Sequence, residues 1–441
     1  MEILYIPVGV PTFHQESAKK EFDNSVTLLK SIDENVVVPN SFLLSIGELK
    51  SYIDGKNPNL VIFQNVTFAN GAFITEVLRK FPCPVLLWTL REPVIDGTRL
   101  RLNSLTGAFS AGNALKAFNR PFEYVLGSPN EDAVKRKISA TVAAVKVKEM
   151  MKSLNILQIG HTPDGFGFGR ALDMEIATVF GSNLLSIEAR ELIETAKKFT
   201  DEEVEPYLEE AKKSVKNLDK IDKKNVYDFA RLFKAYKEYV ESHDVGALSS
   251  RCWPDFFTSF GTPVCTVLAL LNDLGVSSSC EADTYGALSM YIGQKLSSKA
   301  VFFGDPVALD EKNNTVTFWH CGTGACSLAR TDTGAEAGMH CNRKIGPTLE
   351  FGCKAEKEVT VFRVGRIDGK IRFFIAHGEA LDMPKQFYGT SVVVRTANDA
   401  GNLIKSSVCE GWEPHFAVVM ANVYEEIKIL GNFLNIEVIE K

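Results

Sequence analysis

A chain of 441 residues is longer than one hydrophobic core usually supports, so two or three domains are expected. Hydrophobic residues make up 45% of the chain and charged residues 24%, which is the balance of a folded globular protein and excludes an extended disordered region. The formal net charge of -6, without any long cluster of lysines and arginines, argues against a nucleic-acid partner, because phosphates require a basic surface.

The N-terminal residues MEILYIPVGVPTFHQ contain a short apolar run with no basic segment before it, which indicates a first strand rather than a signal peptide. No stretch of the sequence approaches the ~20 apolar residues that span a bilayer, so no membrane partner is expected. The nine cysteines form no CxxC pair, and their odd number suggests reduced thiols. These features predict a cytoplasmic protein.

The first third of the chain alternates short apolar runs, at residues 2–9, 59–64 and 84–90, with amphipathic stretches, at residues 18–31, 72–81 and 133–154. This alternation predicts a parallel, doubly wound, Rossmann-like α/β domain over residues 1–152. Ligands of such sheets bind at the carboxyl ends of the strands. Trp88 and Arg91 lie at one of these expected ends.

A new strand at residues 155–160 begins a second α/β domain of the same kind, which we assign to residues 153–344. After about residue 345 the sequence changes to short β-rich runs divided by an Asp-Gly turn, a pattern typical of an antiparallel sheet or small barrel. Residues 345–441 are therefore expected to form a β-rich C-terminal domain. A helix over residues 415–434 and a short strand at 436–439 are expected to end it.

The segment HTPDGFGFGRAL at residues 161–172 superficially resembles the phosphate loop of dinucleotide-binding proteins. Gly169 follows Gly167 by two residues, where the dinucleotide fingerprint has three, and no acidic ribose ligand follows at the expected distance. We interpret the segment as a flexible loop near a strand end. No nucleotide cofactor is expected.

Three polar motifs interrupt the apolar strands of the second domain. CEAD places Glu281 and Asp283 between a small-residue strand and an apolar helix, where Asp283 suits the helix start. FFGDP places Asp305 where a Gly-X-Pro sequence is expected to end a strand, and FWHCGTG places His320 at another strand end. Alone, Asp305 is typical of a turn and His320 of a buried structural histidine. At successive strand ends, carboxylates and an imidazole converge on one crevice and suit Mn²⁺, Mg²⁺ or another divalent metal.

The order and wording of these motifs, from CWP at residues 252–254 through CEAD, FGD and WHCG to GWEPHF at residues 411–416, resemble the L-fucose isomerase and L-arabinose isomerase superfamily. Residues 104–127 are also similar to the end of that family's first domain, so the resemblance covers most of the chain. It implies an intramolecular oxidoreductase, an aldose–ketose isomerase that acts on a monosaccharide through a metal-stabilised cis-enediol.

The resemblance implies that Glu281, Asp305 and His415 hold Mn²⁺, with Co²⁺ or Mg²⁺ as alternatives. His320 is implied as a second imidazole ligand or a substrate contact. Glu281 and Asp305 are also implied as the acid–base pair, with the division of their roles left open. A homo-oligomer, trimer or hexamer, is implied as well, in which the first domain of one subunit helps to cover its neighbour's site.

Further candidates for contacts with the sugar are Trp88 and Arg91 in the first domain, and Arg251, Trp253 and Asn422 nearer the metal segment. Aromatic faces pack on the C–H groups of sugars, and Arg or Asn binds hydroxyls. Ordinary packing is an equally good interpretation of each residue taken alone.

The substrate stays open at this point. It is expected to be similar to L-fucose, D-arabinose or L-arabinose, or to be an anionic aldose, for which cations are available at Arg91, Arg251, Arg343 and Lys344. Two alternatives to the isomerase also stay open. One is a catalytically inactive sugar-binding or regulatory relative, although such a protein would be free to lose one of the three implied ligands. The other is a metal-dependent sugar epimerase.

Overall fold

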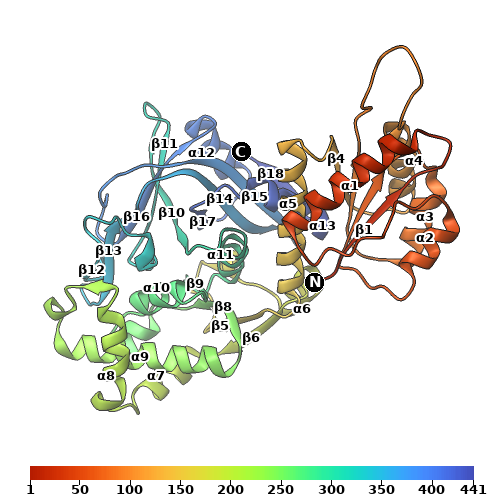
Figure 1. The fold of residues 1–441 in the computed structure, drawn as a ribbon. Helices are drawn as coiled ribbons and strands as arrows, with labels where there is room; N and C mark the ends of the chain where they lie inside the picture. Colours follow the sequence, from red (N-terminus) through yellow and green to blue (C-terminus); the bar gives the residue numbers. More distant parts are fainter. The chain divides into compact units, whose positions relative to one another are not determined.

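The computed structural model describes residues 1–441, and the chain divides into two compact units. The first unit comprises Met1–Glu149 and Glu425–Asn435, and the second comprises Met150–Tyr424 and Ile436–Lys441. Figure 1 shows the order of the elements along the chain. No helix is both long enough and apolar enough to cross a membrane.

The first unit contains a four-stranded parallel sheet in the order β1-β2-β3-β4. Its strands are β1 (Ile3–Val8), β2 (Leu60–Asn65), β3 (Val85–Thr89) and β4 (Phe122–Leu126). Its helices are α1 (Gln15–Ile32), α2 (Ile46–Ile53), α3 (Gly71–Lys80), α4 (Ser104–Ala117), α5 (Asp132–Met151) and α13 (Tyr424–Leu434).

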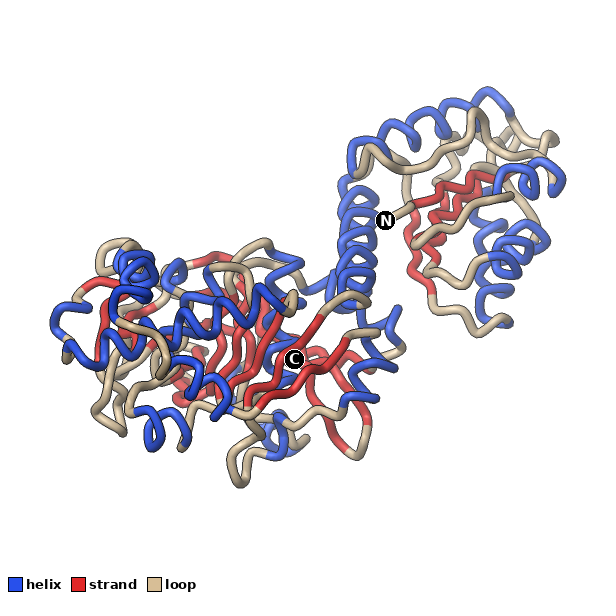
Figure 2. Tube along the Cα trace, turned by 90° about the horizontal axis from the view of Figure 1, so that it is seen from below, coloured by secondary structure: helices blue, strands red, loops and turns tan.

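Helices lie on both faces of this sheet (Figure 2). Tyr5 of β1 stacks on Phe22 of α1 with ring centroids 6.2 Å apart, whereas Leu4 of the same strand joins the core formed with α2, α3 and α4. Every residue of β1, β2 and β3 is therefore buried. Burial of both faces explains why these strands are continuous apolar runs rather than alternating ones.

The second unit contains another parallel sheet, in the order β6-β5-β8-β9. Its strands are β5 (Asn155–Ile159), β6 (Asn183–Ile187), β8 (Val245–Ser250) and β9 (Ser277–Cys280). Its helices are α6 (Asp173–Phe180), α7 (Ala189–Ala196), α8 (Asp201–Lys212), α9 (Lys223–Ser242), α10 (Cys265–Asp273) and α11 (Thr284–Ser297). Because β5 lies between β6 and β8, the strand order reverses beside β5, and such a switch point is where open α/β sheets bind ligands.

Six antiparallel strands close into a barrel in the order β10-β11-β16-β15-β14-β17. They are β10 (Val301–Asp310), β11 (Thr315–His320), β14 (Glu356–Ile367), β15 (Lys370–Ala380), β16 (Thr390–Thr396) and β17 (Phe416–Val419). The pairing of β15 with β16 closes the ring, which removes the exposed strand edges. The predicted fold class, two parallel α/β sheets followed by a small barrel, is therefore confirmed. Two of the six strands, β10 and β11, precede residue 345.

Shorter elements complete the second unit. The strands are β7 (Val215–Lys216), β12 (Ala335–Gly338), β13 (Thr348–Gly352) and β18 (Glu437–Glu440), with helix α12 (Ala400–Cys409). Single turns of 3-10 or π-helix are η1 (Gly167–Gly169), η2 (Leu218–Lys220), η3 (Phe256–Phe260) and η4 (Cys326–Leu328).

Two local predictions were wrong. The expected helix over residues 415–434 begins only at Tyr424, because Phe416–Val419 is a fully buried strand paired with β10 and β14 on its two sides. The strand that carries Asp305 also does not end at Pro306. It continues to Asp310 with a break in register between Pro306 and Ala308, and a bulge of this kind is where a strand tolerates proline.

Candidate active site

The candidate site lies where the carboxyl ends of the parallel strands meet one end of the barrel, within the second unit. Glu281 directly follows β9, and its backbone and that of Ala282 are left-handed, with φ of 59° and 52°. Two successive non-glycine residues in this region are costly and are typical of functional sites. The barrel contributes Asp305 from within β10, His320 at the end of β11 and His415 immediately before β17.

The structure brings the four predicted ligands together. Possible ligand atoms of Glu281, His320 and His415 all lie within 4.8 Å of one another. The Nε2 atom of His415 lies 3.0 Å from Glu281 Oε2 and 3.4 Å from Asp305 Oδ1. Asp305 and His320 reach this point from barrel strands, and not from the parallel sheet that their place in the sequence suggested.

Asp283 has a role that the sequence did not reveal. It caps α11 by accepting a hydrogen bond from Gly286 N at 2.8 Å, as predicted for a helix start, but its Oδ2 also lies 2.9 Å from His415 Nδ1. The two terminal guanidinium nitrogens of Arg363 donate to the two oxygens of this carboxylate at 2.5 and 3.0 Å, and both side chains are fully buried. Asp283 therefore fixes the ring of His415 so that Nε2 faces Glu281 and Asp305, the arrangement by which a carboxylate orients a metal-binding histidine.

A thiol lies behind the second imidazole. The Sγ atom of Cys321 is 3.4 Å from His320 Nδ1 and 4.0 Å from Cys265 Sγ, and Cys265, Cys321 and His340 form a further group of closely spaced possible ligands. Because Nδ1 of His320 faces this thiol, its other ring nitrogen, Nε2, is the one available as a ligand atom beside Glu281.

The electrostatics of the cluster follow from burial and from the opposite charges it brings together. Burial would raise the pKa of Glu281, but the hydrogen bond with His415 holds it below its ordinary value, whereas burial raises the pKa of Asp305. Burial alone would lower the pKa of both histidines. Hydrogen bonds to Asp283 and Glu281 instead raise the pKa of His415 to about 10, and Cys321 raises that of His320 to about 9. The carboxylates around His415 therefore favour its protonated form when no cation lies between them.

The glycine-rich loop after β5 forms one wall of the site. The ring of Phe168 packs edge-on against His415 with centroids 5.4 Å apart, and Phe166 packs against Trp253 at 5.8 Å. Gly169 approaches Asp283 so closely that an added Cβ would lie 2.8 Å from Asp283 Cα. The loop thus has a packing role that its sequence, read as a flexible connection, did not predict.

The predicted sugar contacts separate into two groups. Trp253 follows β8, and its indole nitrogen donates a hydrogen bond to Glu281 Oε1 at 3.1 Å. Arg251, also after β8, pairs with Asp255 at 3.0 Å and with the Nε2 atom of His161 at 2.9 Å.

The other three predicted contacts lie outside the cluster. Asn422 is exposed beyond the far end of β17 and donates to Glu358 at 3.4 Å. Trp88 is fully buried in the first unit with its indole bonded to the Gly127 carbonyl, and Arg91 is exposed and paired with Glu131 at 2.8 and 3.0 Å.

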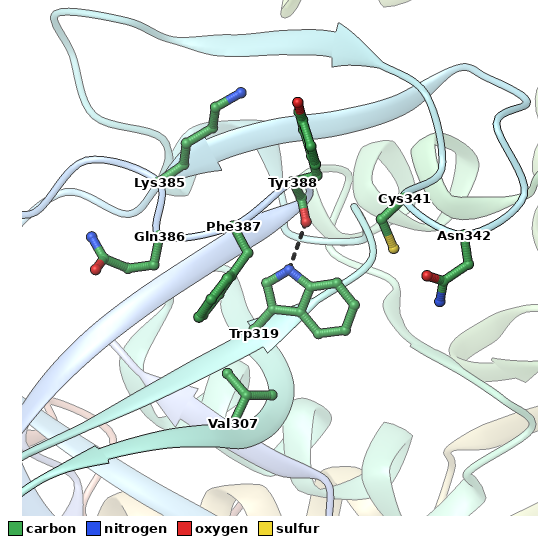
Figure 3. Close-up of a pocket in the computed structure, with 8 residues that line it drawn as sticks. All are labelled: Val307, Trp319, Cys341, Asn342, Lys385, Gln386, Phe387 and Tyr388. Atoms are coloured by element: carbon green, nitrogen blue, oxygen red, sulfur yellow. Dashed lines mark hydrogen bonds between the residues drawn. The ribbon is translucent and has the colours of Figure 1, made fainter.

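Two cavities adjoin the barrel strands that carry the cluster. The larger, of about 720 Å³, is lined by Val307, Trp319, Cys341, Asn342, Lys385, Gln386, Phe387 and Tyr388. Figure 3 shows the Trp319 indole directed at the Tyr388 carbonyl, to which it donates a hydrogen bond of 2.7 Å. Trp319 is the direct ladder partner of Asp305, and Asp305 itself lines the smaller cavity, of about 290 Å³. The larger volume is in the usual range for a small-molecule pocket.

Comparison with known proteins identifies the family to which the chain is similar. The sequence model of the L-fucose isomerase C-terminal domain matches residues 333–441. The chain is 55% identical over 438 residues to a sulfoquinovose isomerase of Clostridium sp. (strain MSTE9), an alignment that covers 99% of this chain and 98% of the relative. It is 38% identical over 439 residues to a sulfoquinovose isomerase of Priestia aryabhattai, covering 99% and 98%, and 37% identical over 443 residues to one of Alkalicoccus urumqiensis, covering 100% and 99%.

Proposed function

Because the chain belongs to the fucose isomerase-like family and is a sugar isomerase, we propose that it is a divalent-metal-dependent enzyme that converts sulfoquinovose, an aldose with a sulfonate on C6, into the corresponding ketose. The name shared by its full-length relatives supports this substrate, and the anionic aldose was among the substrates considered from the sequence.

The observation that carries the metal proposal is the environment of His415. Its Nδ1 atom is committed to Asp283, so its Nε2 atom faces two carboxylates, and carboxylate oxygens with imidazole nitrogens suit Mn²⁺ or Co²⁺ better than Ca²⁺. Glu281, Asp305 and His415 would hold the ion, with His320 as a fourth ligand. A divalent ion there supplies Lewis-acid stabilisation of the negative charge that develops on O1 and O2 of the sugar.

The residues themselves supply proton transfer. Isomerisation removes a proton from C2, transfers a proton from O2 to O1 by way of a cis-enediol, and returns a proton to C1. Glu281 and Asp305, which lie 3.0 and 3.4 Å from His415 Nε2, would share the removal and the return of the proton. Trp253 holds the second oxygen of Glu281 and fixes the direction of its carboxylate.

Assembly and location are part of the same proposal. We expect a trimer or hexamer, as the family implies, and Arg91, which is exposed, is a better candidate for a contact across an interface than Trp88, which is in the core. All nine cysteines are free, which supports a reducing compartment such as the cytoplasm.

The test is to treat the full-length protein with a chelator and assay a panel of neutral and anionic aldoses and ketoses with and without Mn²⁺ or Co²⁺. We expect sulfoquinovose to give its ketose only when metal is present. Glu281→Gln and Asp305→Asn should each lower kcat by at least about a hundredfold, because both remove a charge that attracts the ion and moves the proton. Glu379→Gln, a change at a partly exposed carboxylate paired with Arg395, is the control. Full activity without metal, or an epimer as product, would refute the proposal.

A further inference from the structure

To bind an anionic sugar, a site needs a positively charged side chain that is not already paired with a carboxylate of the protein. A sulfonate keeps its charge at every working pH, and removing it from water is costly unless charged donors replace the water. The carboxylates of Glu281, Asp305 and Asp283 repel it. The cation must therefore lie near this cluster without belonging to its ion pairs.

Four cations were candidates from the sequence, and the structure distinguishes them. Arg91 uses two nitrogens on Glu131 and belongs to the first unit, and Arg251 pairs with Asp255. Arg343 and Lys344 form no ion pair with a carboxylate. Arg343 lies over the rings of Trp253 and Phe257, and Lys344 over the ring of Tyr388.

Arg343 lies one side chain away from the candidate metal ligands. Its guanidinium carbon is 5.8 Å from the Trp253 ring centroid and 5.5 Å from that of Phe257. The Trp253 indole donates to Glu281 at 3.1 Å, so a single indole separates the exposed guanidinium from the carboxylate. A hexose that places C1 and C2 at the metal ligands would extend its C6 group away from them, past Trp253 and toward Arg343.

The turn that carries Arg343 is well fixed. The Nδ1 atom of the buried His340 ring accepts hydrogen bonds of 3.3 Å from the backbone N–H groups of Asn342 and Arg343. The backbone N–H of His340 donates to the Ile345 carbonyl at 2.9 Å. The same ring packs edge-on against Phe257 at 5.0 Å. Asn342 lines the cavity of about 720 Å³ in Figure 3, so this turn forms part of a cavity wall. A guanidinium resting on two rings above a fixed turn loses little conformational freedom on binding an anion.

We propose that Arg343 binds the C6 sulfonate of the substrate and thereby determines the preference for sulfonated over neutral aldoses, an inference that rests on the proposed isomerase function. The Arg343 guanidinium donates hydrogen bonds to the sulfonate oxygens while Trp253 and Phe257 support its planar face.

The experiment compares two sugars that differ only at C6, sulfoquinovose and 6-deoxyglucose, on the full-length, metal-loaded protein. Arg343→Gln should lower kcat/KM for sulfoquinovose by about 10–100-fold, mainly through KM, since a charged hydrogen bond is lost, and should leave that for 6-deoxyglucose unchanged. Arg343→Lys should retain part of the preference. Arg395→Gln, the same change at an exposed arginine paired with Glu379, should alter neither value.

A second measurement uses a ligand that is not itself converted. The inhibition constant of the sulfonated sugar alcohol, which cannot isomerise, should rise by a similar factor in Arg343→Gln and stay constant in Arg395→Gln. An unchanged constant, or an equal loss for both sugars, would overturn the role of Arg343 while leaving the isomerase intact. A wild-type protein that isomerises neutral sugars but not sulfoquinovose would instead refute the proposed substrate.

Discussion

At the scale of single residues, the site depends on a line of contacts that begins away from the reacting atoms. Arg363 holds Asp283, Asp283 holds His415 Nδ1, and His415 Nε2 faces Glu281. All members except Glu281 are buried, so each charge in the line is compensated by the next rather than by water. The orientation of His415 is therefore set before any ligand arrives.

The first prediction concerns Asp283, which the sequence suggested is only a helix cap. Asn caps helices as well as Asp does, so Asp283→Asn would be nearly neutral if capping were its whole role. Because the change also leaves Arg363 buried without a charged partner and frees His415, we expect a loss of about 3–5 kcal/mol in unfolding free energy and about 10–100-fold in Mn²⁺ affinity. Denaturant titration and calorimetric metal binding measure the two effects.

The matched control is Asp399→Asn at the start of α12. This aspartate caps its helix by accepting from Asn402 N at 2.7 Å and has no histidine partner. Near-neutral results for both variants would show that Asp283 does no more than cap α11.

The second prediction follows from the pKa of His415, raised to about 10 in the metal-free protein. Below that pH the ion must displace the proton on this ring, so metal affinity rises with pH and binding releases a proton. We expect the association constant for Mn²⁺ to increase about tenfold or more for each pH unit between roughly pH 6 and 8. Calorimetry in buffers of different ionisation enthalpy counts the protons released. Zero release at pH 7 would contradict the assignment of His415 as a ligand.

The resemblance to known isomerases pointed to Glu281, Asp305, His320 and His415, because each lies in a short motif, and the structure brings their side chains close together. It could not reveal the second role of Asp283. Its partners are 80 and 132 residues away in the sequence, and neither contact leaves a local pattern. Buried arginines such as Arg363 are also hard to identify from sequence, since one arginine on a strand looks like any exposed charge.

At the scale of elements, the loop between β5 and α6 shows why glycine spacing alone is a weak guide. Gly169 allows the loop to approach Asp283, and this places Phe168 against His415. Close backbone approach is a common reason for glycine, and it cannot be distinguished from turn formation without the partner in view.

The third prediction compares two glycines of this loop. Gly169→Ala would place a methyl group 2.8 Å from Asp283 Cα, so the loop must move away from the site. We expect a loss of about tenfold or more in kcat/KM together with weaker metal binding, because Asp283 and Phe168 both orient His415. Gly167→Ala is the control, since no atom lies within 4 Å of its added Cβ. It should be neutral or slightly stabilising, by up to about 1 kcal/mol. Equal effects of both changes would remove the basis for this packing role.

The wrong local predictions have a common physical cause. HFAVVM resembles the start of an apolar helix, and Gly-X-Pro resembles a strand end, when only neighbours in sequence are considered. In the structure β17 and β10 pair with each other, from Val301 with Val419 to Gly304 with Phe416. The paired residues are more than a hundred positions apart in the sequence, and this long-range pairing outweighs the local preferences of both segments.

At the scale of the whole molecule, alternating strands and helices made the two parallel sheets predictable, and the β-rich runs after residue 345 made the barrel predictable. That β10 and β11 belong to the barrel could not be predicted. Each follows a helix or a strand in the sequence, as a further strand of the parallel sheet would. As a result the barrel, and not the parallel sheet, supplies Asp305, His320 and His415, while the sheet supplies Glu281. The candidate metal ligands therefore join these two layers of the second unit.

The last prediction uses this joining role. A ligand that binds only the folded state stabilises it by about 2.7 kcal/mol at a hundredfold excess over its dissociation constant. Since every candidate metal ligand belongs to the second unit, Mn²⁺ should slow hydrogen exchange by up to about a hundredfold at the amides of β10, β11, β17 and the start of α11. The amides of β1 to β4 in the first unit should exchange at the same rate with and without metal.

Exchange followed by mass spectrometry on the full chain resolves both sets of peptides. His415→Gln should abolish the difference in the second unit. Equal slowing in both units, or slowing that survives this substitution, would show that the ion binds elsewhere.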